Sequence, residues 1–140
     1  MSKPFSQALY DRDDHAKEFV IDYFTIRHGF KVYVNPDPYG IDLIVENERG
    51  IFELEVEVKH NWKGRIFPYK TIHFAARKLK FAQNPENVSF IMLNDDWSYG
   101  LVIEGETFAQ SPIIVKDTIY TQRERFVEIP FDKGTLLRLI

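Results

Sequence analysis

The sequence predicts a mixed α/β domain with helices packed on a central β-sheet, and three stretches lead to that prediction. Apolar residues recur at helical spacing between about residues 13 and 28. Leu54, Val56 and Val58 alternate with charged residues, which is the period of a strand with one buried face. Residues 88–93 are apolar on both faces and indicate a central strand. The predicted order is α, β, β, β, α, β, β, followed by further strands.

The length and composition of the chain show which classes of protein it can belong to. A chain of 140 residues with 44% hydrophobic and 15% aromatic residues is long enough to bury a core, so we expect one globular domain. The N-terminus lacks the apolar region of a signal peptide, and no apolar run is long enough to cross a membrane. Cysteine is absent, which excludes disulfides, thiol catalysis and cysteine-ligated zinc. We expect a cytoplasmic protein without membrane contacts.

The N-terminal helix is predicted from about residue 13 to residue 28. Asp13 or Asp14 can cap its start, and Gly29 can end it. Its predicted buried stripe consists of Ala16, Phe19, Val20, Tyr23 and Phe24.

The next part of the chain predicts a β-hairpin. Residues 30–34 form a short strand, and the two prolines of residues 35–40 place a turn after it. The hairpin strands are residues 40–45 and 52–59, joined by the polar residues 46–50.

One face of this hairpin gathers acidic side chains. Glu53, Glu55, Glu57 and Lys59 share a face of the second strand, and Asp42 on the first strand can join them. Carboxylates a few ångströms apart repel one another unless a cation lies among them, and Mg²⁺ prefers such oxygen ligands. A lysine beside the metal can hold the attacking water or neutralise charge on a phosphate. The alternative is a half-exposed strand whose polar face lies in water.

These residues resemble the PD-(D/E)XK nuclease superfamily. Asp42 matches the family's Asp, and Glu57-Val58-Lys59 follows fifteen residues later as its (D/E)-x-K. The family's leading Pro is replaced by Ile41. The resemblance implies a restriction-endonuclease-like core over about residues 11–105, with a mixed central sheet flanked by helices. Residues 106–140 would add a C-terminal β extension within the same domain.

The resemblance also implies a function, a Mg²⁺-dependent DNA nuclease in which Mn²⁺ can substitute and no nucleotide cofactor is needed. Asp42, Glu57 and the carbonyl of Val58 would hold the metal, and Lys59 would orient or activate the water. The layout is nearest to Holliday-junction resolvases, which implies an endonuclease on branched or structured DNA that acts as a homodimer. The alternative on the same fold is a catalytically inactive module that binds nucleic acid or protein.

Two further carboxylates are candidates for this site. The hairpin register is expected to place Asp42 opposite Glu55, with Glu57 as its diagonal neighbour. Glu57 is the preferred ligand because of its spacing to Lys59, and Glu55 would support it or bind a second metal. Glu18 matches the first-helix Glu that reaches the metal site in many members of the superfamily. Alternatively, Glu18 is a surface helix residue.

A basic segment follows the acidic strand. Residues 59–80 contain seven Lys or Arg and no Asp or Glu, whereas the net charge of the whole chain is −3. The rest of the chain holds 11 basic and 21 acidic residues, a net charge of −10. Basic charge after the acidic strand is where a phosphate backbone would lie, although a solvated surface is the alternative. The candidates for DNA contacts are Lys63, Arg65, Lys70, Arg77 and Lys80.

A second helix is predicted over residues 71–83, with Thr71 as its cap. Ile72, Ala75, Ala76, Leu79 and Ala82 would form its buried face. Trp62, in the loop before it, can stack on a base or close the core, and the core is the preferred interpretation.

The remaining strands are predicted at residues 101–103, 113–115 and 126–129. The C-terminal residues 136–140 are too apolar to remain in water, so they should pack on the core or on a second copy of the chain.

Overall fold

The computed structural model describes residues 7–119 and 122–140, with side chains from Asp14 onward. Its main sheet has six strands in the order β1-β2-β3-β5-β6-β9. β3 and β5 run parallel, and the other neighbouring pairs are antiparallel, so the sheet is mixed. The strands are Lys31–Val34, Leu43–Asn47, Gly50–Val58, Val88–Leu93, Tyr99–Glu104 and Thr135–Arg138.

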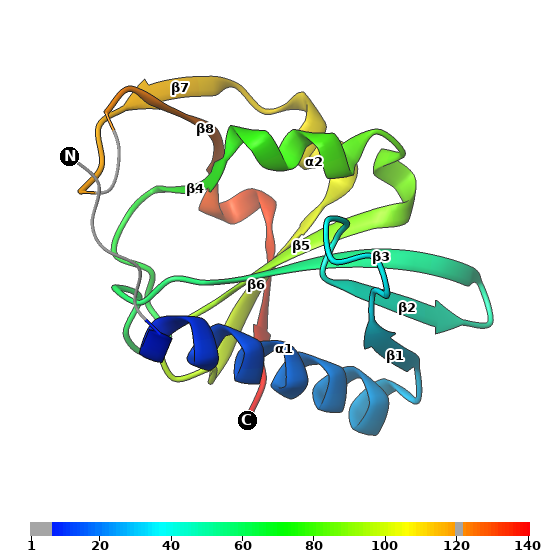
Figure 1. The fold of residues 1–140 in the computed structure, drawn as a ribbon. Coiled ribbons are helices and arrows are strands. Elements are labelled where there is room, and N and C mark those ends of the chain that lie inside the picture. The colour runs from blue at the N-terminus through cyan, green and yellow to red at the C-terminus, as the bar shows by residue number, and fades with distance from the viewer. Residues whose placement is uncertain (1–6, 120–121) are drawn as a thin grey trace.

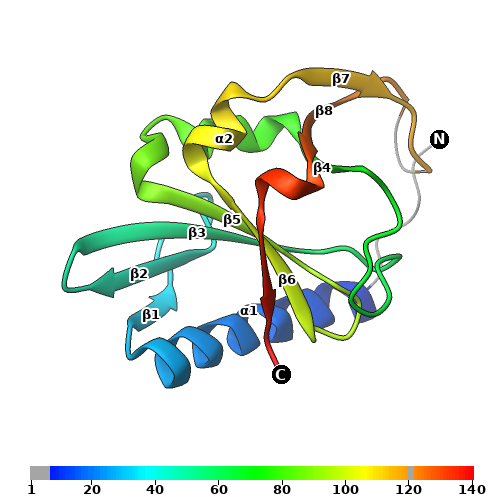
Figure 2. The ribbon, with the colours of Figure 1, turned by 180° about the vertical axis from the view of Figure 1, so that it is seen from behind.

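The other elements lie on the two faces of this sheet. Helix α1 (Gln7–His28) crosses one face, and a smaller three-stranded sheet lies on the opposite side together with α2 (Figures 1 and 2). The smaller sheet has the order β4-β8-β7, with the strands Thr71–Ala75, Glu124–Pro130 and Ile113–Lys116. α2 and the 3-10 helices η1, η2 and η3 span Gly105–Gln110, Ala76–Ala82, Pro85–Asn87 and Phe131–Lys133. No described helix is long and apolar enough to cross a membrane.

The central strand β5 separates two hydrophobic cores. Its side chains alternate between the cores, and Phe90 to Leu93 are almost completely buried. Ile91 and Leu93 face the core that contains Ala16 of α1. Phe90 faces the other core and stacks on Phe108 of α2, with ring centroids 3.8 Å apart. The prediction of a strand buried on both faces is confirmed.

Most of the predicted N-terminal half is confirmed. The short strand, the antiparallel hairpin and the stripe of α1 are present. Gly29 has a positive φ of 67° and its N–H donates to the carbonyl of Thr25, which ends the helix as expected. The predicted start is wrong, because α1 begins at Gln7 and Asp13 and Asp14 therefore lie inside the helix.

The predicted helix over residues 71–83 is also wrong. Residues 71–75 form β4, and η1 follows it directly. Ile72 and Phe74 are fully buried while Thr71 and His73 are half-buried, which is the alternation of a strand. β4 pairs with β8, more than 50 residues later, with Phe74 opposite Val127. This long-range pairing overrides the helical spacing of the segment.

The C-terminal region completes both sheets. β7 and β8 build the smaller sheet with β4, and β9 pairs with β6 at the edge of the main sheet. Leu139 is buried on the α1 side, so the apolar tail packs on the core of its own chain. The short helix α2 has no counterpart among the predicted elements. Trp62 is completely buried, which confirms its preferred place in the core.

Candidate active site

The end of β3 has β5 on one side but no strand on the side of β2. The pairing of the two strands ends at Leu43 opposite Leu54, while β3 continues to Val58. Asp42 lies at this open edge. Its N–H donates to Glu55 Oε1 at 3.1 Å, and its Oδ2 accepts the N–H of Val56 at 2.9 Å. Asp42 therefore lies opposite Glu55, as the register predicted, and the backbone of β3 fixes its carboxylate.

A hollow of about 280 Å³ opens at this edge, and we call it the acidic hollow. It is lined by Asp14 and Lys17 of α1, Asp42, residues 55–58 of β3, and Lys78 of η1. Four of its lining side chains are carboxylates, from Asp14, Asp42, Glu55 and Glu57.

Two lysines pair with the carboxylates of the acidic hollow. Lys17 Nζ is 3.2 Å from Asp42 Oδ1 and 3.8 Å from Asp14 Oδ1. Lys78 Nζ is 2.6 Å from Glu57 Oε1 and 3.2 Å from Glu55 Oε2. The lysines thus neutralise part of the acidic charge, and Lys78 bridges the two glutamates of β3.

Glu55 carries the strongest electrostatic perturbation in this hollow. The residue is 6% exposed, and burial raises the pKa of its carboxyl from 4.5 to about 7. Lys78 opposes this shift, and the charge of Asp42 adds to it. Burial alone would lower the pKa of Lys17 and Lys78, but their carboxylate partners outweigh burial and hold both pKa values above 10.5.

The donor set of the acidic hollow fits a hard divalent cation. The buried carboxyl of Glu55 lies beside the carboxylate of Asp42, and such a pair gains from a cation between the two groups. Among the described residues, no three Asp, Glu, His or Cys side chains are arranged to hold a metal. Mg²⁺ usually needs only one or two protein carboxylates, with water and substrate supplying the other oxygens. Such a cation would share the carboxylates with Lys17 and Lys78.

Lys59 does not line the acidic hollow. It borders a second hollow of about 530 Å³, which we call the basic hollow and which shares Glu57 and Val58 with the first. Burial and the nearby ammonium of Lys116 lower the pKa of Lys59, and Glu57 opposes them. The other charged or titratable residues at its lining are His60, His73, Arg77, Lys116 and Glu124. The structure therefore brings Lys78, and not Lys59, to the carboxylates.

The contribution of α1 also differs from the expected one. Glu18 is exposed and does not line the acidic hollow, whereas Asp14 and Lys17 do. Residues three apart lie on the same helix face, so the spacing of Asp14 and Lys17 was a signal that the sequence offered.

The basic segment is partly neutralised by acidic residues from elsewhere in the chain. Lys63 pairs with Asp95 at 2.8 Å, and Arg77 pairs with Glu124 at 3.3 Å. The remaining three predicted DNA contacts are exposed and form no ion pair within the described part of the chain: Arg65, Lys70 and Lys80.

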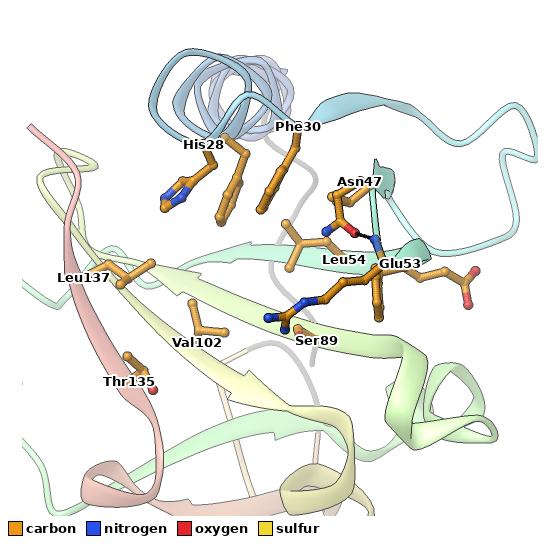
Figure 3. Close-up of a pocket in the computed structure, with 13 residues that line it drawn as sticks. His28, Phe30, Asn47, Glu53, Leu54, Ser89, Val102, Thr135 and Leu137 are labelled. Carbon is orange, nitrogen blue, oxygen red and sulfur yellow. Dashed lines mark hydrogen bonds between the residues drawn. The ribbon is translucent and has the colours of Figure 1, made fainter.

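An apolar hollow of about 410 Å³ lies between the C-terminal end of α1 and the main sheet (Figure 3). His28 and Phe30 extend over it from one side, and Leu54, Val102 and Leu137 line it from the strands. Its lining is mainly aromatic and aliphatic, and phosphoryl transfer requires charged groups. The acidic hollow is therefore the candidate active site.

Solved structures share this fold. The Archaeoglobus fulgidus Hjc, a Holliday junction resolvase from an archaeal hyperthermophile, is 9% identical with a TM-score of 0.54. The match covers 86% of this chain and 88% of that chain. D212, a nuclease from a fusselovirus, is 15% identical with a TM-score of 0.52, and the match covers 96% of this chain and 89% of that one. The chain has the restriction-endonuclease-like fold. No family model and no curated protein sequence matches.

This fold is the architecture that the resemblance to PD-(D/E)XK nucleases implied. The mixed sheet with an antiparallel hairpin at its start is the part that holds Asp42, Glu55 and Glu57. At these identities the comparison establishes the fold alone, so the roles of individual residues rest on the geometry of the two hollows.

Proposed function

We propose that this protein is a Mg²⁺-dependent nuclease that hydrolyses phosphodiester bonds of DNA. The observation that carries the proposal is the meeting of Asp42, Glu55, Glu57 and Lys78 in one hollow of a restriction-endonuclease-like fold. The structural neighbours support it, since both are described as nucleases.

Each carboxylate has a role in this proposal. Asp42 and Glu55 hold the metal, because the backbone fixes Asp42 and burial disfavours an uncompensated charge on Glu55. Glu57, whose carboxylate pairs with Lys78, and the carbonyl of Val58 are further candidate ligands at the border of the hollow. Bound Mg²⁺ would polarise the phosphate and lower the pKa of a bound water. Mn²⁺ is expected to substitute.

Lys78 takes the role that the sequence motif gave to Lys59. Its ammonium lies between Glu55 and Glu57, where it can hold the attacking water or neutralise charge that builds on the phosphate. Asp14 and Lys17 bring the contribution of α1, in place of Glu18. Lys17 pairs with Asp42 and keeps its carboxylate directed into the hollow.

The proposed preference among DNA substrates is based on one of the two similar structures. The Archaeoglobus protein is a Holliday junction resolvase, so we propose that four-way or otherwise branched DNA is cleaved in preference to linear duplex. A resolvase must cut two strands at one junction, and a homodimer supplies two acidic hollows for that purpose.

The test is a cleavage assay on linear, nicked and four-way-junction DNA with Mg²⁺, with Mn²⁺ and with EDTA. We expect cleavage with either metal and none with EDTA. Asp42→Asn should lower the rate by about 10²-fold or more, because it weakens the site where charge is stabilised. The matched control is Lys31→Gln, which removes an exposed charge paired with Glu46 at the other end of the hairpin. An Asp42→Asn variant that cleaves DNA at the wild-type rate would refute the assignment of the acidic hollow as the active site.

The second candidate is a module that binds DNA without cleaving it. The ion pairs of Lys17 and Lys78 favour this alternative, because they already neutralise the carboxylates without a metal. DNA binding without cleavage of any of the three substrates under either metal would establish it.

A further inference from the structure

We propose that the basic hollow binds a phosphate of the same DNA strand, next to the phosphate that is cleaved in the acidic hollow. The inference rests on the proposed function and extends it to a second hollow, which includes Lys59 of the sequence motif but also residues outside that motif. Its main residues are Lys59, which directly follows β3, His73 from β4 and Lys116 from β7.

Lys116 is held in place by two contacts within the hollow. Its Nζ is 2.6 Å from His73 Nδ1, and it lies 4.7 Å from the centroid of the Phe126 ring. Such a distance to an aromatic face is within the range of a cation–π interaction. The ammonium is therefore positioned before any ligand arrives, which lowers the cost of binding an anion.

His73 connects Lys116 to an acidic partner on the next strand. Its Nε2 is 2.9 Å from Glu128 Oε2, so the neutral ring donates its Nε2–H to the carboxylate. Nδ1 then carries a lone pair, which accepts a hydrogen bond from the Lys116 ammonium. This assignment follows from the hydrogen-bond network. Lys116 keeps two further N–H donors for a ligand.

Lys59 adds a second ammonium to the same hollow. Within the described part of the chain, neither Lys59 nor Lys116 has a carboxylate within ion-pair distance, unlike the neighbouring Arg77 and Lys78. The two ammoniums repel each other, as the effect of Lys116 on Lys59 shows. An anion between them would relieve this repulsion, and a phosphodiester provides two non-bridging oxygens that share one negative charge.

The position of the basic hollow identifies which phosphate it would take. Glu57 and Val58 border both hollows, so the hollows meet at the end of β3. A strand that places one phosphate at Glu57 and Lys78 therefore passes next over Lys59 and Lys116. The smaller sheet, which carries His73 and Lys116, would thereby serve to bind substrate.

The experiment measures DNA affinity over a series of salt concentrations in Ca²⁺, with a gel at the end to verify that the DNA is intact. Loss of one phosphate contact lowers the salt slope by about one. We expect Lys116→Gln to lower both the slope and the affinity. Lys116→Arg should retain the slope because it keeps the cation. Lys31→Gln is the matched control on the far part of the sheet and should change neither.

The outcomes separate this inference from the proposed function. If Lys116→Gln retains the wild-type slope and affinity, as Lys31→Gln should, the hollow does not bind phosphate, whether or not the protein cleaves DNA. A wild-type protein that does not bind DNA overturns it as well. A protein that binds DNA through Lys116 but cleaves none with Mg²⁺ or Mn²⁺ supports the hollow and refutes the nuclease.

Discussion

The acidic and basic hollows meet at Glu57 but differ in how their charges are compensated. In the acidic hollow, Lys17 and Lys78 pair with the carboxylates, so charges of both signs are already in contact. In the basic hollow, Lys59 and Lys116 lie together without a carboxylate partner in the described chain. The first arrangement suits a cation that joins the lysines among the carboxylates, and the second suits an anion. Chemistry and strand binding are thus assigned to separate but adjoining sites.

The difference arises from which elements meet at the end of β3. The acidic hollow is built by α1, the hairpin and η1, which all lie in the first 82 residues. The basic hollow needs β7 and β8 from the C-terminal region as well. A second sheet on one face of the main sheet therefore provides a cation, Lys116, that the nuclease motif itself does not contain.

The largest expected effect comes from comparing Lys78→Gln with Lys59→Gln. Lys78→Gln should lower turnover by about 10²-fold or more, because it removes the cation beside the phosphate, while DNA affinity in Ca²⁺ is retained. Lys59→Gln should weaken affinity and lower the salt slope by about one, while turnover at saturating DNA changes much less. Single-turnover cleavage and a salt series of binding measure the two effects.

The reverse result would reassign the two lysines. If Lys59→Gln abolishes turnover and retains affinity while Lys78→Gln cleaves normally, the water-activating lysine is the one in the motif Glu57-Val58-Lys59. The acidic hollow would then bind metal without holding the catalytic ammonium.

The second effect is on the stability of the metal-free protein and concerns Glu55. Its pKa in the folded state is about 7, above the ordinary 4.5, so the folded protein binds more protons than the unfolded chain between these values. Stability should therefore fall as pH rises from about 4.5 to about 7. Glu55→Gln removes this penalty and should be the more stable protein at pH 8, by up to about 3 kcal/mol.

Urea unfolding in EDTA at pH 5 and pH 8 measures this effect. The control is Glu46→Gln, whose carboxylate pairs with the exposed Lys31, and it should follow the pH dependence of the wild type. A Glu55→Gln variant that is less stable than the wild type at pH 8 would mean that its ion pair with Lys78 outweighs the cost of burial.

The smallest expected effect is on DNA binding, and it compares an exposed lysine that has no ion pair within the described chain with one that has. Lys80 is exposed and lies over the ring of Phe81, whereas Lys63 already pairs with Asp95. Lys80→Gln should lower the salt slope of DNA binding by about one, and Lys63→Gln should lower it less. A larger change for Lys63→Gln would show that DNA displaces Asp95 and that the loop after β3 contacts phosphate directly.

The sequence by itself predicted the elements in which hydrophobic residues repeat with one clear period. The stripe of α1, the alternation of β3 and the apolar strand β5 each predicted an element that the structure contains. The hairpin is a local structure, so its register could be predicted as well, and Asp42 lies opposite Glu55 as expected. Three of the four carboxylates of the acidic hollow, Asp42, Glu55 and Glu57, were found in this way because they lie within one hairpin.

Only the tertiary structure decided which cations reach those carboxylates. Residues 71–82 carry a helical spacing, but pairing with β8 makes their first part a strand and leaves η1 to place Lys78 beside Glu55 and Glu57. The same smaller sheet brings Lys116 to Lys59, 57 residues away in sequence. Contacts between distant segments depend on the packing of two sheets, and no local period encodes that packing.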